Sequence, residues 1–184
     1  MSLVLPSASN GSRVKSVRES VTGASSPLAL QDPYSRPVDV RQADLEDVDE
    51  LARLRATWRE RPADARYLAG FREWFRQERA GRWWWIATDS QAAVGMVNLK
   101  LFDRMPTPDR PVTQWGYLAN LFVVPGHRGR GVGASLVQAV IDRSRAEGLV
   151  RIVLSPSELS VPLYGRMGFR PAADLLLLPL DAAS

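Results

Sequence analysis

The chain has 184 residues and contains no cysteine, which excludes disulfide bonds, thiolate metal sites and cysteine nucleophiles. Histidine occurs only at His127, so a histidine-rich metal site is excluded too, and we expect no metal. No apolar run approaches the ~20 residues needed to cross a bilayer, and the first residues lack the basic and apolar regions of a secretory signal. We therefore expect a cytoplasmic protein with no membrane partner.

The residues that are present are typical of a globular protein, with 45% hydrophobic and 24% charged side chains. Residues 1–36 are rich in serine, contain no Phe or Trp and show little apolar periodicity, so we interpret them as a flexible extension. Residues 37–184 are long enough for one domain with a buried core. The net charge of +4 suits a polyanionic partner, either a small molecule or a nucleic acid.

Hydrophobic periodicity from Pro37 onward predicts alternating helices and strands. The strands are expected at 38–41, 83–87, 92–102, 114–123, 150–154, 169–170 and 175–178. The helices are expected near 45–60, from 67 to about 80, at 132–147 and at 160–167. Three consecutive tryptophans occupy the second strand, and we interpret them as packing residues, with Trp83 and Trp85 on one face and Trp84 on the other. Aromatic residues on the second helix are interpreted mainly as core.

The most informative stretch joins a strand, a glycine-rich turn and a helix. The apolar run Leu121–Val124 has the length and composition of a strand, and a Pro-Gly pair ends it. After the turn at 128–134, apolar residues recur at helical spacing. Glycines let an anion approach the free N–H groups at a helix start, where the helix dipole is positive. The pattern predicts a phosphate-binding turn, and Arg128 and Arg130 add positive charge.

Two familiar phosphate-binding loops do not fit this turn. A Walker A loop requires Lys and Ser/Thr where Val132 and Gly133 stand, and a dinucleotide fingerprint requires its third glycine one place later. The spacing that fits is Arg-x-x-Gly-x-Gly, formed by Arg128, Gly131 and Gly133. Together with the preceding strand, it resembles the coenzyme A loop of the GNAT superfamily of N-acetyltransferases.

A second stretch resembles the same superfamily. The run Leu163-Tyr164-x-x-Met167-Gly168-Phe169 is similar to its second signature, in which the tyrosine hydroxyl lies near the sulfur of acetyl-CoA. The resemblance extends from about Pro37 to Leu180. It implies an α/β fold with a twisted mixed sheet, helices on both faces, and a central strand that splays from its parallel neighbour.

The resemblance also implies the residues of the site. Acetyl-CoA would be the co-substrate, with its pantetheine arm along the strand and its pyrophosphate on the amides of the turn. Tyr164 would be the catalytic acid that protonates the leaving sulfur. Ser157 stands where many relatives carry an Asn that contacts the cofactor. The implied cofactor-binding residues are Leu121, Phe122, Val123, Arg128, Gly129, Arg130, Gly131, Val132, Gly133, Ala134 and Ser157.

The activity implied is direct transfer of the acetyl group to a primary amine of a small molecule or a peptide. Some relatives carry a Glu on the central strand as general base, but Tyr117 stands at that position here. The base is therefore open between a water relayed by Asn120 or by backbone carbonyls, and Glu158, which is the weaker candidate. His127 lies on the phosphate side of the turn and is not expected to act as the base.

The sequence also bears on two other functions and on self-association. The missing carboxylate keeps open a non-catalytic acyl-CoA sensor of the same fold, although Tyr164 favours the enzyme. The Arg-Gly-Arg-Gly segment is too short, and too closely flanked by apolar residues, for us to expect a nucleic-acid partner. The strand expected at 175–178 could pair with a second copy of the chain and form a homodimer.

Overall fold

The computed structural model of the chain describes residues 38–109 and 111–180, so the extension expected at 1–36 lies outside the described residues. The centre of the fold is a five-stranded sheet with the strand order β1-β2-β3-β4-β5. The strands are β1 (Asp39–Gln42), β2 (Arg82–Asp89), β3 (Ala92–Asp103), β4 (Gln114–Val123) and β5 (Ile152–Val153). The first four are antiparallel, and β5 runs parallel to β4, which confirms the predicted mixed sheet.

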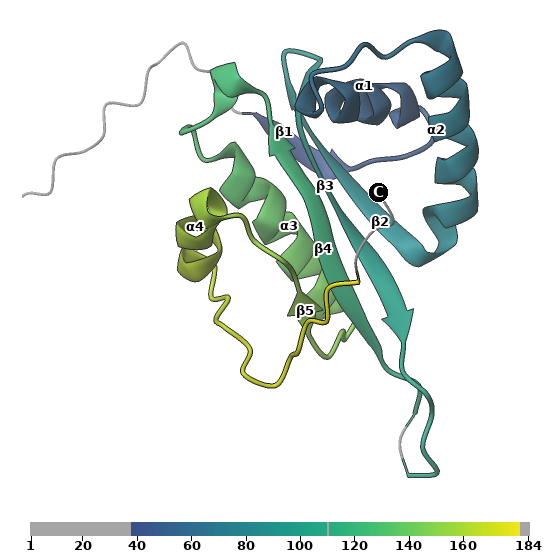
Figure 1. The fold of residues 1–184 in the computed structure, drawn as a ribbon, viewed down its shortest axis with the longest axis vertical. Helices are drawn as coiled ribbons and strands as arrows, with labels where there is room; N and C mark the ends of the chain where they lie inside the picture. Colours follow the sequence, from purple (N-terminus) through teal and green to yellow (C-terminus); the bar gives the residue numbers. More distant parts are fainter. Residues whose placement is uncertain (1–37, 110, 181–184) are drawn as a thin grey trace, which may run out of the picture. The chain divides into compact units, whose positions relative to one another are not determined.

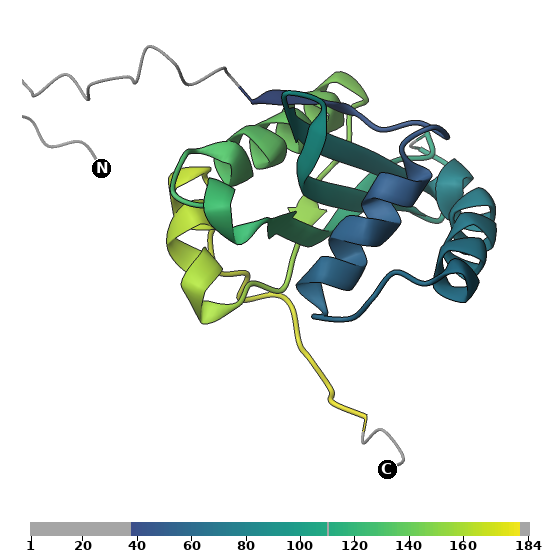
Figure 2. The same cartoon turned by 90° about the horizontal axis from the view of Figure 1, so that it is seen from above.

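Helices cover both faces of this sheet, as predicted (Figures 1 and 2). The helices are α1 (Val48–Trp58), α2 (Ala65–Glu78), α3 (Val132–Ala146) and α4 (Val161–Arg166). Figure 2 shows α1 and α2 on one side of the sheet and α3 and α4 on the other. None of the helices within residues 38–109 and 111–180 has the length and apolar character of a bilayer-spanning segment.

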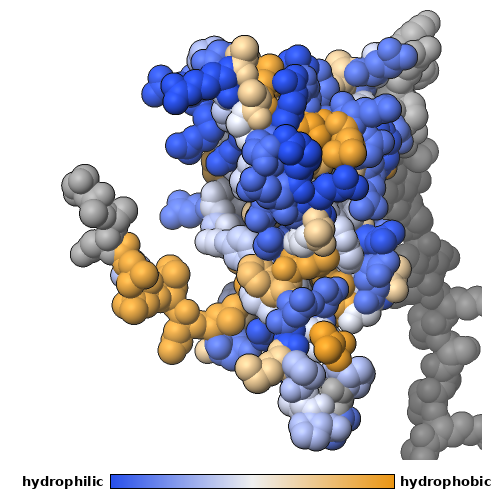
Figure 3. Space-filling view, turned by 90° about the vertical axis from the view of Figure 1, so that its right-hand side faces the viewer, coloured by the Kyte–Doolittle hydropathy of each residue, from blue (hydrophilic) through white to orange (hydrophobic). Residues whose placement is uncertain are grey.

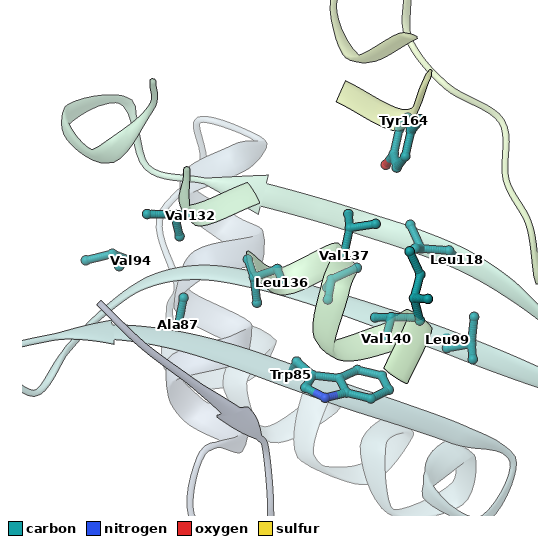
Figure 4. Close-up of a cluster of buried hydrophobic side chains, with 12 residues drawn as sticks. Trp85, Ala87, Val94, Leu99, Leu118, Val132, Leu136, Val137, Val140 and Tyr164 are labelled. Atoms are coloured by element: carbon teal, nitrogen blue, oxygen red, sulfur yellow. The ribbon is translucent and has the colours of Figure 1, made fainter. Parts of the chain in front are cut away.

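The core on the α3 side is built as the periodicity predicts. The predicted apolar face of α3 is buried throughout, at Val132, Leu136, Val137, Val140 and Ile141. Figure 4 shows four of these side chains facing Trp85, Ala87, Leu99 and Leu118 of the sheet. Burial of this face fixes α3, and with it the turn that precedes the helix, against the strands.

The three tryptophans of β2 divide between the two cores, as alternation along a strand requires. Trp85 lies in the α3-side cluster, and Trp83 packs at the edge of that cluster. Trp84 is only 4% exposed and lies in the other cluster, under α1 and α2, with Ile86 and Phe122. The expectation that these tryptophans are packing residues is confirmed.

Helix α1 begins at Val48, three residues later than the predicted first helix. The residues before it still form hydrogen bonds that would cap a helix: Asp44 Oδ1 accepts from the Glu46 N–H at 2.8 Å, and Asp47 Oδ2 accepts from the Asp44 N–H at 2.9 Å. Asp47 also accepts two hydrogen bonds from the Arg41 guanidinium, at 2.6 and 2.7 Å. These bonds connect β1 to the start of α1.

The prediction of strands at 169–170 and 175–178 was wrong. Residues 167–180 contain no strand, and β5 is reduced to two residues. Prolines at 171 and 179 flank the leucine run and cannot donate to a ladder. The run also lacks the alternation of a half-buried strand, so only its composition suggested one. Leu176 is fully exposed and Leu177 is 89% exposed.

Candidate active site

The site begins where β4 and β5 part. The two strands pair only at Gly116–Ile152 and Tyr117–Val153, whereas the other edge of β4 stays paired with β3 as far as Val123. Beyond Tyr117, the β5-facing edge of β4 therefore has no strand partner among the described residues. Its main-chain N–H and C=O groups are available to an extended ligand that adds to the sheet as a strand would. The predicted splay is confirmed.

A β-bulge interrupts β4 beside this opening. Asn120 and Leu121 together oppose the single residue Val97, and Asn120 has a φ of +56°. Asparagine tolerates this left-handed conformation better than most other non-glycine residues. Because of the extra residue, Leu118 and Leu121 both face α3, although they are three positions apart. The bulge was not predicted from the sequence, in which its one signal is an asparagine within an apolar strand.

The turn after β4 has an open, donor-rich conformation. Gly129 and Gly131 have φ values of +74° and +84°, and a Cβ atom built at either position would meet nothing within 4 Å. Gly131 caps α3 without a side-chain hydrogen bond, and the Ser135 N–H is the amide that bonds back to the Gly131 carbonyl. The amides at 132–134 therefore point out of the helix at its positive end. This open cradle fits a pyrophosphate.

The basic residues of the turn have different surroundings. Arg128 donates from Nε to the Val123 carbonyl at 2.9 Å, which fastens the turn to the end of β4. Arg130 is exposed beside the turn. His127 Nε2 lies 2.9 Å from Asp89 Oδ2, and this contact with His127 is the main reason that the pKa of the Asp89 carboxyl lies below its usual range. The His127–Asp89 contact joins the turn to the β2–β3 hairpin.

Tyr164 projects from α4 into the same region. The side chain is 7% exposed, and it packs in one cluster with Leu121 and Val123. Its ring meets Phe169 edge-on at 5.5 Å, and Figure 4 shows the hydroxyl end pointing toward β4. The hydroxyl makes no hydrogen bond with the described residues. Burial raises the pKa of Tyr164, so the phenol stays protonated at neutral pH and can donate a proton.

Ser157 forms hydrogen bonds only within its own segment of the described chain. It precedes a 3₁₀ turn (Glu158–Ser160), where its carbonyl accepts a hydrogen bond from Ser160 Oγ at 2.8 Å. Its hydroxyl lies 3.1 Å from the same Ser160 hydroxyl. Within the described part of the chain, these hydrogen bonds give Ser157 a local structural role. A role toward a cofactor stays a prediction.

A cavity, which we call the aromatic pocket, lies on the α1–α2 face of the sheet beside the bulge. Its volume is about 290 Å³. It is lined by Arg55, Tyr67, Phe71, Trp74, Trp84, Met96 and Asn120. The sequence analysis interpreted the α2 aromatics as core, yet only Phe75 of that helix is buried. The spacing predicted which aromatics share a face, and the face proves to be mainly the wall of a cavity.

Among the described residues, no carboxylate lies on β4 or lines the aromatic pocket. Glu78 is the last residue of α2, and its carboxylate bonds Lys100 at 2.8 Å and Arg82 at 3.0 Å. Hydrogen bonds from Lys100 and Arg82 hold the pKa of Glu78 below its usual range, which makes it a weak proton acceptor. The predicted alternative, Glu158, lies exposed in a 3₁₀ turn. Residues 38–109 and 111–180 also contain no cluster of three or more potential His, Cys, Asp or Glu metal ligands.

Comparison with known proteins identifies relatives of the chain. It is 32% identical over 77 residues to glucosamine 6-phosphate N-acetyltransferase of Trypanosoma brucei brucei, an alignment that covers 42% of this chain and 50% of the relative. The chain therefore spans about half the length of that curated relative. It is 30% identical over 132 residues to the L-methionine sulfoximine/L-methionine sulfone acetyltransferase of Pseudomonas paraeruginosa, covering 69% of this chain and 72% of the relative.

A solved structure shows the same fold. The crystal structure of a predicted acetyltransferase with acetyl-CoA from Clostridium acetobutylicum superposes with a TM-score of 0.63 at 21% identity, covering 78% of this chain and 96% of that one. The Acetyltransferase (GNAT) family profile matches residues 45–169, which include β4, the turn, α3 and Tyr164. That family uses acetyl-CoA as its acetyl donor. Because the profile matches more than half of the chain, the chain belongs to the GNAT acetyltransferase family, a family of acyltransferases.

Proposed function

We propose that the chain is an acetyl-CoA-dependent N-acetyltransferase that transfers the acetyl group directly to a primary amine, and that residues 37–184 carry this activity. One observation supports it above the others. The unpaired edge of β4 is followed by the glycine-rich turn and the N-terminus of α3, which has no side-chain cap, and the Tyr164 hydroxyl points toward the same strand. A single elongated ligand can therefore contact the strand, the turn and the tyrosine together.

Each part of acetyl-CoA has a matching part of this site. The amides of Gly129 to Ala134 would hold the pyrophosphate at the positive end of α3. Arg130 would add positive charge from its exposed position beside the turn, and Arg128 would hold the turn against β4. Main-chain groups of β4 at Leu121, Phe122 and Val123 would pair with the pantetheine arm, where Arg128 now occupies the Val123 carbonyl. Ser157 would contribute a weak polar contact at most.

The chemistry requires a donor at the carbonyl oxygen and a proton for the leaving group. The neutral amine nitrogen attacks the thioester carbon, and the oxygen becomes negative while the new N–C bond forms. A backbone N–H at Val123 or its neighbour would stabilise that charge. As the C–S bond breaks, Tyr164 would give its proton to the departing sulfur, and the amine would lose its extra proton to water. The absence of cysteine excludes an acyl-enzyme on sulfur.

The acceptor is proposed to be a small molecule. Two of the curated relatives are named for glucosamine 6-phosphate and for methionine sulfoximine or sulfone, all of which are small primary amines. The aromatic pocket of about 290 Å³ lies just below the usual range of small-ligand cavities, ~300–1,000 Å³, which favours such an acceptor over a peptide. No nucleic-acid or membrane partner is proposed. The homodimer stays a prediction.

The alternative is an acyl-CoA sensor of the same fold without catalysis. Its support is the lack of a carboxylate on β4, where Tyr117 stands. Against it stands the buried, protonated Tyr164, because a binding module has no need of a proton donor toward the strand that would hold the thioester. Release of CoA with any amine would exclude the sensor.

The first test is calorimetric titration of the protein with acetyl-CoA. Gly131→Glu places a carboxylate in the open space of the turn, and we expect it to abolish binding. Gly148→Glu is a matched control at the other end of α3, because Gly148 also has a positive φ of +69° and open space around its Cβ position. We expect the Gly148 variant to bind acetyl-CoA as the wild type does. Absence of binding by folded wild-type protein would overturn the proposed function.

A further inference from the structure

The aromatic pocket contains a cation that is not paired with an anion. The Arg55 guanidinium lies 4.6 Å from the centre of the Trp58 ring and makes no ion pair or hydrogen bond with the described residues. Arg53 of α1 pairs with Glu50, and Arg72 of α2 pairs with Asp49. Arg66 of α2 also makes no ion pair with the described residues, but it does not line this pocket. A planar guanidinium at the wall of a cavity, with its donors free, is suited to bind a carboxylate with two parallel hydrogen bonds.

The polar groups of the pocket are mostly donors. No carboxylate is among the residues that line it. The nearby Asp64 is occupied as the N-cap of α2, where its side chain accepts from the Tyr67 N–H. The indole N–H of Trp84 is buried and has no partner among the described residues. A buried donor without a partner is costly, so a ligand oxygen or an ordered water is expected to satisfy it.

The remaining walls are apolar and aromatic. Phe71 and Trp74 lie 5.4 Å apart between ring centres, and both contact the Trp84 ring, at 6.3 and 5.8 Å. Tyr67 completes the group at 6.0 Å from Phe71, and burial is the main cause of its raised pKa. Such a group of rings is suited to bind the flat or apolar part of a ligand. It offers no negative charge to pair with an ammonium group on the ligand's side chain.

We propose that the acceptor is an α-amino acid with an apolar or aromatic side chain. This inference rests on the proposed function and assigns its substrate class. The carboxylate of the amino acid would bind Arg55, and its side chain would lie against Phe71 and Trp74. Its amine would face β4 at the bulge, where the Asn120 side-chain carbonyl can accept a hydrogen bond. Polyamines and amino sugars lack the carboxylate, and a peptide carries an amide in its place.

The test compares three L-amino acids with their own amides. Phenylalanine, methionine and leucine are assayed for CoA release with the full chain, each beside its α-carboxamide, which keeps the amine and side chain and loses only the negative charge. We expect the acids to be preferred, and Arg55→Gln to lower kcat/KM for the acids about 10- to 100-fold while leaving the amides within about twofold. Arg53→Gln, on the same helix but away from the pocket, is the control and should change neither.

A second readout does not depend on turnover. The tryptophan fluorescence of CoA-saturated protein should change on titration with phenylalanine, because Trp74 and Trp84 line the pocket, and Arg55→Gln should weaken that binding by the same factor. Equal kcat/KM for acids and amides in the wild type would overturn the inference and leave the acetyltransferase standing. Acetyl-CoA binding without turnover of any amine would instead remove the proposed activity, and the inference with it.

Discussion

The Tyr164 hydroxyl forms no bond within the described structure, which separates its chemical role from its structural one. We predict that Tyr164→Phe lowers kcat about 100-fold, the lower part of the range for general acid catalysis. The acetyl-CoA dissociation constant and the melting temperature should stay the same, because the ring and its contact with Phe169 are kept. Steady-state kinetics with an active amine, together with calorimetry, measure all three quantities.

An unchanged kcat in Tyr164→Phe would show that this tyrosine only lines the site. A rise in the acetyl-CoA dissociation constant with a matching fall in kcat/KM would instead assign it to cofactor binding. Either result would leave the leaving sulfur without an identified proton donor among the residues singled out from the sequence.

Asn120 holds the bulge in a left-handed conformation, and this makes a prediction about stability. Asn120→Gly should keep the free energy of unfolding within about 0.5 kcal/mol, because glycine adopts this φ without strain. Asn120→Val should lower it by about 1–3 kcal/mol, because a β-branched residue is disfavoured there. Urea denaturation of the two variants beside the wild type measures the difference. Equal stability of the Gly and Val variants would contradict the strained bulge.

At the scale of elements, the contact between β1 and the start of α1 depends on pH. The hydrogen bond from Arg41 is the main cause that holds the pKa of Asp47 below its usual range. A carboxyl whose pKa is lower in the folded state stabilises the fold above the unfolded pKa of ~3.9, and this stabilisation is lost as pH falls through the folded value. We predict that Asp47→Asn costs about 1 kcal/mol at pH 7 and progressively less below about pH 4.

The control for Asp47→Asn is Glu46→Gln, because Glu46 is an exposed neighbour whose side chain makes no ion pair with the described residues. Urea unfolding at several pH values between 3 and 7 should give parallel curves for wild type and the Glu46 variant. A constant difference between wild type and the Asp47 variant across this range would show that the ion pair contributes nothing to stability.

Elements with a strong local signal were predicted closely from the sequence. The bounds of β4 were predicted at Gln114–Val123, and the buried face of α3 was predicted residue by residue. The turn was predicted from its glycines, which adopt positive φ values without strain. The last strands were predicted wrongly, since leucine content alone does not specify pairing. The bulge at Asn120 was missed because it depends on the register with β3, which is a contact between distant parts of the chain.

The same distinction applies to the site. The turn and Tyr164 each lie in a short sequence motif, so their resemblance to the GNAT superfamily could be read from the sequence alone. The observed fold is the one which that resemblance implies. The aromatic pocket joins α1, α2, β2, β3 and β4, and no single stretch contains it. Arg55 was not singled out, because its significance comes from the missing partner, which only the packed structure shows.

At the scale of the whole molecule, the leucine-rich segment predicts association of the chain with itself. Leu176, Leu177 and Leu178 are 77–100% exposed, and Figure 3 shows an apolar segment projecting from a largely hydrophilic surface. Apolar runs of this kind favour burial against a second surface. Sedimentation analysis should detect a concentration-dependent dimer, and replacing the three leucines by serine should leave a monomer that binds acetyl-CoA unchanged. A wild-type chain that stays monomeric at all concentrations would contradict the homodimer.

The two sides of the bulged strand β4 border two different regions of the proposed site. On its β5-facing edge the main chain is open to the proposed acetyl donor, and on its α1–α2 face the side chains border the aromatic pocket. If the aromatic pocket binds the acceptor as proposed, substitutions on α1 and α2 would change the choice of amine without altering the groups that bind the acetyl donor. In evolutionary terms, a scaffold of this kind can diversify its acceptors after gene duplication while each copy keeps a working donor site.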